Sequence, residues 1–411
     1  MSRCSRKGEE LRPVEDALEQ MLSRAHRRTG TELLPTAEAL GRVLAEPVLS
    51  QTNIPPWPNS AMDGYCLRME DWRCGEALPI SQRIPAGVWP SPLENGTAAR
   101  IFTGAVLPSP ADTVVMQEDC EERDGQLWIR DDHIERGQHI RPEGQDIRKG
   151  TTVLGAGTRL GPVHLGVIAS IGLAEVQAVQ PLTVGILSTG DELVMPGEAL
   201  LQGKIYNSNG FTLHGLLSAL GCKICNYGIV ADTPEATAKV LLQAADECDV
   251  IIGTGGVSVG EEDHVKTQVE ALGQLHVWKL AIKPGKPFAF GEVQKTPFLG
   301  LPGNPSAVLV TFCMLARPFL LRCLGVDKVA PLTLPIRSAL PAARSRIRTE
   351  YLRVSVGVGS DGCPEAVLAG NQSSGVLSSA CEASGLMVIP AGHSRQPGDI
   401  FDFIPLSALL N

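Results

Sequence analysis

The chain has 411 residues, a formal net charge of −9, and a composition that is 43% hydrophobic and 20% charged. This length predicts two to four domains, and the acidic balance disfavours nucleic acid or an anionic membrane surface as a partner. The eleven cysteines have no framework spacing, no apolar signal segment opens the chain, and no run reaches transmembrane length. These features predict a cytoplasmic protein.

The first third of the chain predicts a helical start and then a β-rich part. Amphipathic patterns indicate helices over 13–28 and over 36–45, the second with Thr36 as its N-cap. From Gln51 to about residue 147 the sequence becomes proline-rich and then strand-like, which is typical of a separate β-rich domain.

Two segments of this β-rich part are chemically notable. Asp63 and Gly64 follow no helical or strand period, and such a pair is more often a turn than a catalytic element. A strand that ends in Thr103 and Gly104 offers a hydroxyl group that either meets a ligand or caps a turn. The residues alone leave both alternatives open.

From residue 181 the pattern alternates between strands and helices. Strands are predicted at 183–187, 223–229 and 250–252, with helices at 209–220 and after Pro234. Such alternation predicts right-handed crossovers and one parallel sheet. Because Asp191, Glu192 and Asp232 each follow a strand, we expect them to gather at one edge of that sheet.

The stretch 249–263, DVIIGTGGVSVGEED, predicts a strand, a glycine-rich loop and a helix start. Such loops hold anions, and the acids that close this one indicate an accompanying metal ion. The loop matches neither a dinucleotide fingerprint, which Val257 and Ser258 break, nor a P-loop. A tight turn without a ligand remains the simple alternative for the loop taken alone.

Cations follow in the next strands. Lys283 and Lys286 lie in the rigid segment KPGKP, and the turn LPGNPS precedes an apolar helix at 307–321, so both segments are suited to bind an anion. Beyond residue 330, short apolar runs predict a small β-barrel or sandwich, in which NQSSG at 371–375 reads as a turn.

Seven motifs in order, NSAMDGY, IFTGA, STGDEL, GTGGVSVGEED, KPGKPFAFG, LPGNPSAV and NQSSG, resemble those of the molybdopterin molybdenumtransferases, the family of bacterial MoeA and the gephyrin E domain. The resemblance covers nearly the whole chain from about Leu34. It implies an elongated, L-shaped, multidomain α/β chain that forms a homodimer. The implied subdomains are 1–50 with 148–180 (linking), 51–147 (extended β-rich), 181–329 (a parallel-sheet molybdopterin-binding domain) and 330–411 (a small β-barrel).

The resemblance also implies a reaction. In this family, Mg²⁺-dependent chemistry hydrolyses adenylylated molybdopterin, releases AMP and inserts molybdate, which is the last step of molybdenum cofactor biosynthesis. The implied partners are a second copy of the chain, a separate molybdopterin adenylyltransferase, and molybdoenzyme apo-proteins or their chaperones; neither nucleic acid nor a membrane is expected.

The resemblance assigns roles to residues by position. The implied catalytic residues are Asp63 and Thr103, which reach in from the partner subunit, with Asp232, Asp263, Lys283 and Lys286. The implied magnesium ligands are Glu192, Asp232 and Asp263. The implied substrate-binding residues are Ser188, Gly255, Gly256, Ser258, Asn304, Ser306, Arg353, Ser373 and Ser374.

Two other functions fit parts of the sequence. A molybdopterin adenylyltransferase would share the sheet domain without needing the β-rich part, and a non-catalytic scaffold would resemble the gephyrin E domain in its clustering role. Retention of the charged residues disfavours an inert scaffold. Cys222 and Cys225 have redox spacing, but they precede a strand rather than open a helix, so core cysteines are the expected reading.

Overall fold

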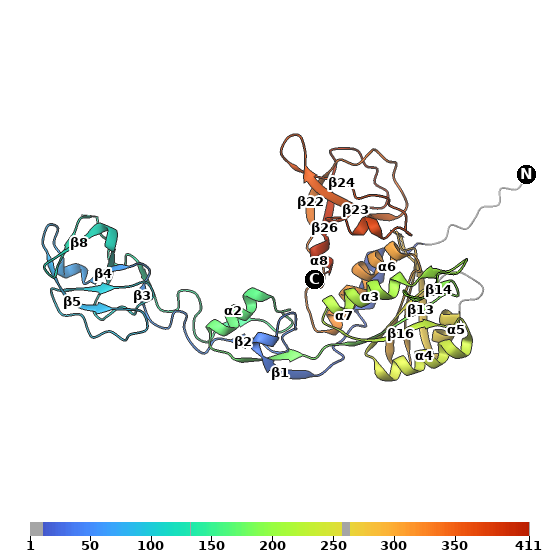
Figure 1. The fold of residues 1–411 in the computed structure, drawn as a ribbon, viewed down its shortest axis with the longest axis horizontal. Coiled ribbons are helices and arrows are strands. Elements are labelled where there is room, and N and C mark those ends of the chain that lie inside the picture. Colours follow the sequence, from blue (N-terminus) through green and yellow to red (C-terminus); the bar gives the residue numbers. More distant parts are fainter. Residues whose placement is uncertain (1–10, 132, 257–263, 411) are drawn as a thin grey trace, which may run out of the picture.

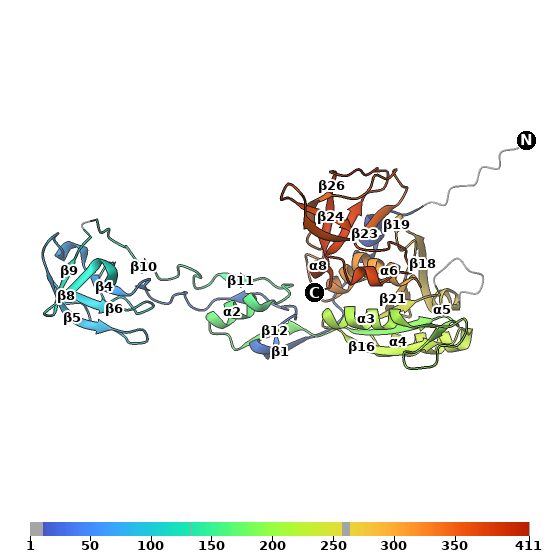
Figure 2. The same ribbon diagram turned by 45° about the horizontal axis from the view of Figure 1, so that its top comes forward.

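The computed structural model describes residues 11–131, 133–256 and 264–410. It shows an elongated multidomain α/β chain, as predicted, with a β-rich part at one end and a helix-covered sheet and a barrel at the other (Figure 1). A small linking part lies between them. Both views place the barrel next to the large sheet and far from the β-rich end (Figure 2).

The body of the molecule is a six-stranded sheet. Its order is β16 (Lys223–Val230), β13 (Thr183–Thr189), β17 (Val250–Thr254), β21 (Thr296–Leu301), β20 (Pro287–Val293) and β18 (Gly273–Lys279). The first four strands are parallel, as the alternating pattern predicts. The last two are antiparallel additions, so the sheet is mixed at this edge. The parallel strands bring their carboxyl ends to one edge.

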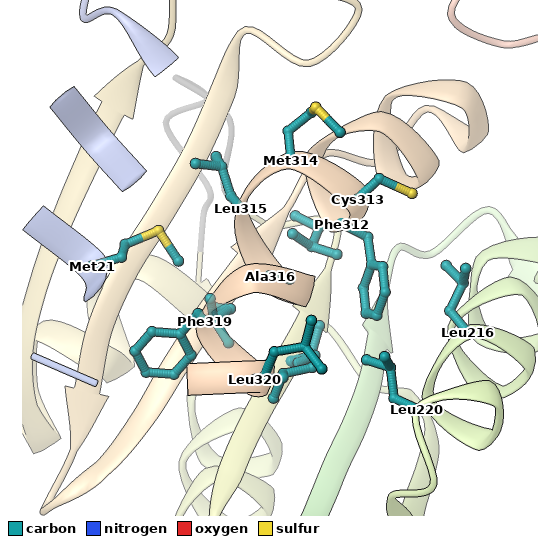
Figure 3. Close-up of a cluster of buried hydrophobic side chains, with 14 of the residues drawn as sticks. Met21, Leu216, Leu220, Phe312, Cys313, Met314, Leu315, Ala316, Phe319 and Leu320 are labelled. Atoms are coloured by element: carbon teal, nitrogen blue, oxygen red, sulfur yellow. The ribbon is translucent and has the colours of Figure 1, made fainter. Parts of the chain in front are cut away.

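Helices cover both faces of this sheet. They are α1 (Val14–Leu22), α3 (Ser208–Ala219), α4 (Pro234–Glu247), α5 (His264–Leu272), α6 (Pro305–Thr311) and α7 (Arg317–Cys323). α4 and α5 share one buried cluster, and α1, α3, α6 and α7 share a larger one on the other face. Figure 3 shows Phe312 and Leu320 in this larger cluster, with Met21 of α1 and Leu216 of α3.

α6 and α7 continue through a π-helical segment, Phe312–Ala316. Within the described residues, Pro305–Cys323 is the one helical stretch that is long and apolar enough to cross a membrane, and 94% of its most apolar window is buried inside the protein. Such burial is typical of a core helix, because the apolar side chains are already covered by protein.

The linking part joins chain segments that are distant in sequence. It contains β1 (Thr31–Pro35), β2 (Val48–Leu49), β11 (Thr152–Leu154), α2 (Pro162–Ser170) and β12 (Glu175–Val179). β1 pairs with β12, and β2 pairs with β11. The prediction of a helix over 36–45 is wrong: only the 3-10 turn Thr36–Glu38 forms, Gly41 adopts a φ of 76°, and Val43 and Leu44 make bridges to other segments.

The β-rich end is a second six-stranded sheet. Its order is β7 (Thr113–Met116), β4 (Gly64–Leu67), β6 (Ala98–Ile101), β5 (Leu78–Ile84), β9 (Gln126–Ile129) and β8 (Cys120–Arg123). We call this part the distal sheet. It is joined to the linking part by two extended segments that pair through β3 (Asn59–Ser60) and β10 (Ile140–Arg141).

The C-terminal part is a small closed barrel, as predicted. Its strands are β22 (Leu334–Ser338), β23 (Thr349–Val358), β24 (Pro364–Leu368), β25 (Gly385–Ile389) and β26 (Ile400–Pro405), followed by α8 (Leu406–Leu410). The pairing of β23 with β25 closes it. The short strand β19 (Ile282–Lys283) pairs with β23 and thereby joins the barrel to the body.

We propose to keep the four predicted subdomains, with one change. α1 falls within 1–50, which the sequence assigns to the linking part, but Val14, Ala17 and Met21 are buried against the body. Arg12 also forms a bridge with Leu280 of the body. The helix therefore belongs to the body by packing, because its apolar face is covered there.

Candidate active site

The carboxyl ends of β13 and β17 are tied to the start of α3 by a buried chain of hydrogen bonds. Thr254 Oγ1 donates to Ser188 Oγ (3.1 Å), and Ser188 Oγ donates to Asn207 Oδ1 (3.3 Å), which also caps α3 by accepting from Gly210 N (3.1 Å). Ser188 is 3% exposed. Its observed role is therefore to place the strand ends and α3, and it does not line the cavity described below.

The two described glycines of the central loop are held where no side chain fits. Gly255 has a φ of 82°, and a Cβ there would lie 2.4 Å from Thr189 O. Gly256 has a φ of 60°, and a Cβ would lie 2.7 Å from Val265 Cγ2 of α5. The loop backbone thus passes close to both β13 and α5, which requires glycine. Ser258 and Asp263 lie outside the described residues.

The segment KPGKP at 283–287, which we call the lysine turn, connects β19 to β20. Lys283 Nζ donates to Glu350 Oε1 at 2.7 Å, and Arg346 Nε lies 3.2 Å from the same oxygen. Glu350 belongs to β23 and is 5% exposed. Because a buried carboxylate needs cationic partners, this ion pair fixes both Lys283 and the contact between body and barrel. Lys286, at the other end of the turn, also lines the cavity.

The barrel contributes its loop 371–375, which Arg353 supports from below. Arg353 Nε donates to Ser379 Oγ (2.7 Å), and its second nitrogen donates to the carbonyls of Asn371 (2.9 Å) and Ser373 (3.2 Å). Arg353 is 1% exposed, so its guanidinium does not reach the cavity in this structure. Its predicted contact with an oxyanion stays a prediction, and the observed hydrogen bonds give Arg353 a supporting role for the loop that carries Ser373 and Ser374.

The start of α6 meets the same loop. Ser306 is fully buried, its Oγ donates to Val376 O (2.5 Å) and its N–H donates to Ser374 O (3.0 Å). Asn304 lies at the cavity surface, whereas Ser306 does not line the cavity. Of this predicted pair, Asn304 is therefore exposed to a ligand and Ser306 joins the body to the barrel.

These elements enclose a cavity of about 990 Å³. Predicted residues that line it are Glu192, Gly255, Gly256, Lys283, Lys286, Asn304, Ser373 and Ser374. The sequence assigned no role to other lining residues, among them Thr189, Tyr206, Asn209, Arg348, Asn371 and Gln372. Asn209 belongs to the segment NSN at 207–209, and Tyr206 precedes it; asparagines before a helix are a capping signal, which could have drawn attention to this segment. No local sequence pattern marks Arg348 or Glu350.

The acids predicted to hold magnesium are only partly brought together. Glu192 lines the cavity, and Asp232 does not. Asp263 lies outside the described residues, among which no group of three or more His, Cys, Asp or Glu side chains is placed to hold a metal ion. Magnesium commonly uses only one or two protein carboxylates together with substrate phosphates, so Glu192 fits as a ligand beside a bound phosphate.

Asp63 and Thr103 lie together in the distal sheet. Thr103 N and Thr103 Oγ1 both donate to Asp63 Oδ1, at 2.8 and 2.9 Å. These two hydrogen bonds lower the pKa of Asp63, with a smaller contribution from the charge of Arg100. The pair is exposed and lies at the opposite end of the molecule from the cavity (Figure 1). A single chain in this conformation therefore does not bring it to the lysine turn.

Cys222, the first cysteine of the CxxC pair, is partly buried and does not line the cavity. Cys222 belongs to the edge of the larger buried cluster, and its burial raises the pKa of its thiol to about 12. The thiolate is therefore disfavoured at neutral pH, and thiolate character is what makes a cysteine reactive.

Comparisons with known proteins agree with this architecture. Residues 12–172 match the family described as MoeA N-terminal region (domain I and II), 185–322 match a probable molybdopterin binding domain, and 335–406 match the MoeA C-terminal region (domain IV). A molybdopterin molybdenumtransferase of Haemophilus influenzae is 41% identical over 317 residues, covering 76% of this chain and 78% of the relative. The chain belongs to the molybdopterin molybdenumtransferase family. It is thus an enzyme of the transferase class.

Other members of the molybdopterin molybdenumtransferase family extend the match. The protein of that name from Nostoc sp. is 36% identical over 376 residues, covering 89% of this chain and 86% of the relative. The crystal structure of a molybdopterin biosynthesis MoeA protein from Pyrococcus horikoshii OT3 covers 96% of this chain and 100% of its own, with 27% identity and a TM-score of 0.82. The family fold therefore extends over nearly the whole chain.

Proposed function

We propose that this chain inserts molybdate into adenylylated molybdopterin in a Mg²⁺-dependent reaction that releases AMP. The names of its relatives support metal transfer to molybdopterin, and the family membership supports a place in molybdenum cofactor biosynthesis. The adenylylated substrate, the release of AMP and the use of Mg²⁺ go beyond what these names state and are part of our proposal.

One observation carries it: cationic side chains face the glycine loop in a chain that is acidic overall. Lys283, Lys286 and Arg348 line the same cavity as Gly255 and Gly256. Phosphoanhydride and molybdate groups are both anionic, and they need fixed cations and backbone donors more than they need covalent partners. A net charge of −9 makes such a local concentration of cations functionally meaningful.

The proposed chemistry uses these groups to position and neutralise charge. The oxygen of a water molecule forms a bond to the adenylyl phosphorus, the bridging P–O bond breaks, the molybdopterin phosphate leaves, and the water protons pass to solvent. Lys283, held by Glu350, and Lys286 stabilise the leaving phosphate and then the incoming molybdate.

Magnesium would be held by Glu192, with Asp232 and Asp263 as the further proposed ligands. When bound, the ion would neutralise phosphate charge and lower the pKa of a coordinated water.

We propose that a second copy of the chain completes the site, because Asp63 and Thr103 lie far from the cavity of their own chain. A separate adenylyltransferase would supply the substrate, and molybdoenzyme apo-proteins or their chaperones would accept the product.

The test is AMP release from adenylylated molybdopterin with Mg²⁺, measured with and without molybdate. We expect release that depends on molybdate, and a loss of at least about a hundredfold in Lys286→Met, since oxyanion stabilisation commonly has this weight. Lys295→Met is the matched control, because Lys295 is an exposed lysine in the β20–β21 turn.

Two outcomes would favour the alternatives. Transfer of AMP from ATP to molybdopterin by this chain would point to an adenylyltransferase. Absence of any AMP release from correctly folded protein would point to a scaffold.

A further inference from the structure

Three chain segments meet at the Asp63–Thr103 pair. Asp63 immediately precedes β4, and Thr103 lies two residues after β6. Gly64 of β4 pairs with Ile101 of β6. From the other side, Gln117 N donates to Asp63 O at 3.0 Å. The geometry of the pair thus depends on how β4, β6 and the segment after β7 are held together.

Arg100 contacts all three segments. One terminal nitrogen donates to Gly64 O (3.3 Å), the other donates to Gln117 Oε1 (2.5 Å), and its Cζ lies 4.9 Å from the ring centroid of Phe102, the residue before Thr103. The Tyr65 ring lies 5.0 Å from the same carbon. Within the described part of the chain, Arg100 takes part in no ion pair. Its planar guanidinium is therefore used for hydrogen bonds and stacking.

We propose that Arg100 is the positioning residue of the Asp63–Thr103 pair: it holds the segments before and after the pair so that both donors of Thr103 point at one oxygen of Asp63. The inference rests on the proposed function, in which this pair serves the reaction. Among the described titratable groups, Arg100 is the one whose charge acts on Asp63. It therefore both orders the pair and favours the ionised carboxylate.

Arg83 is a built-in control. It pairs with Arg100 across β5 and β6, and its Cζ also lies 4.9 Å from the Phe102 ring. Within the described residues, the Arg83 side chain has only this ring contact and donates no hydrogen bond to the segments that carry the pair. Arg83→Ala therefore removes a neighbouring cation and one stacking contact but leaves the hydrogen bonds of Arg100 to Gly64 and Gln117 in place.

The experiment uses the full-length chain with two readouts. The first is the pH titration of the Thr103 methyl signal by NMR, which reports ionisation of Asp63 directly. The second is the rate of AMP release from adenylylated molybdopterin. The variants are Arg100→Ala, Arg100→Lys and Arg83→Ala, with circular dichroism to check folding.

In Arg100→Ala we expect the titration midpoint to move up toward the ordinary aspartate value and kcat to fall about ten- to a hundredfold with KM nearly unchanged, because misplacement acts on the reacting geometry. Arg100→Lys keeps the charge without the planar fork, so it should recover only part of kcat. Arg83→Ala should leave both readouts within about twofold of the parent.

An unchanged Thr103 titration in Arg100→Ala would overturn the inference, as would an equal loss in Arg83→Ala. Complete recovery by Arg100→Lys would also overturn it, since charge alone would then suffice. If the parent protein releases no AMP, but the titration midpoint of the Thr103 signal still differs between the parent and Arg100→Ala, the proposed function fails and the positioning role stands.

Discussion

Gly285 shows how one residue can determine the shape of the candidate site. It lies between Lys283 and Lys286, has a φ of 113°, and leaves space for no Cβ, which would lie 2.5 Å from Thr311 Cγ2. Gly303 also lines the cavity, but a Cβ there would meet nothing within 4 Å. The conformation and the surrounding space therefore require glycine at position 285, whereas neither requires it at position 303.

We predict that Gly285→Ala destabilises the protein by about 2–4 kcal/mol, because it combines backbone strain with a clash against α6. The lysines would be displaced and AMP release reduced. Gly303→Ala should change the free energy of unfolding by less than about 0.5 kcal/mol. Urea denaturation of both variants checks the pair, and equal stabilities would contradict the conformational role of Gly285.

Thr103→Val gives a pH prediction. The two hydrogen bonds from Thr103 lower the pKa of Asp63 below its ordinary value of 3.8. The carboxylate therefore stays ionised at pH 3.8 and above, and it becomes protonated only as the pH falls through the lowered pKa. Removing the hydroxyl while keeping the N–H, which has the larger effect, should move the acid limb of the AMP-release profile part of the way upward. An acid limb that stays in place would show that Asp63 does not control it.

At the scale of the elements, the loop 371–375 is held by one buried side chain, that of Arg353. Arg353→Met removes the hydrogen bonds that the guanidinium donates to two carbonyls and to Ser379 Oγ, and it should lower the free energy of unfolding by about 2–4 kcal/mol. We also expect a raised KM, because Ser373 and Ser374 would no longer be held at the cavity. Arg344→Met, at an exposed arginine between β22 and β23 of the same barrel, is the control. Chemical denaturation measures the free energy of unfolding of both variants. Equal decreases in the two would argue against the support of the loop by Arg353.

The elements that the sequence predicted well are those with local signals. α4 begins after Thr233, whose side chain caps it, and has a proline in its first turn, and β17 opens with the apolar run 250–252. The segment 36–45 failed because pairing with distant segments, such as that of Leu44 with Ala178, outweighs its helical pattern. The pairing of Lys283 with Glu350 joins residues 67 positions apart, and the burial of Arg353 depends on barrel closure, so no local pattern reveals either.

At the scale of the whole molecule, the main consequence is the separation of the cavity from Asp63 and Thr103. If each site is built from two chains, Asp63→Asn and Lys283→Met should each abolish activity alone, and their mixture should recover about a quarter of the parent rate, since random pairing gives half mixed dimers with one intact site each. AMP release after mixing and re-equilibration measures this.

No recovery in the mixture, with mixed dimers confirmed by mass spectrometry, would mean that each site uses a single chain. The distal sheet would then have to approach its own cavity by a large rearrangement of the linking part. Asp63→Asn mixed with the parent protein serves as the reference for subunit exchange.

The two connections to the distal sheet run side by side. β2 pairs with β11, Ile54 forms a bridge with Ile147, and β3 pairs with β10, so the chain enters and leaves the distal part at neighbouring points. Topologically this part is an insertion that can be excised and replaced by a short loop without interrupting the body. In the proposed dimer, a full-length partner would still supply Asp63 and Thr103 to the cavity of such a shortened chain. The shortened chain would supply neither residue to the cavity of its partner. One working site per pair would remain, and it would belong to the shorter subunit.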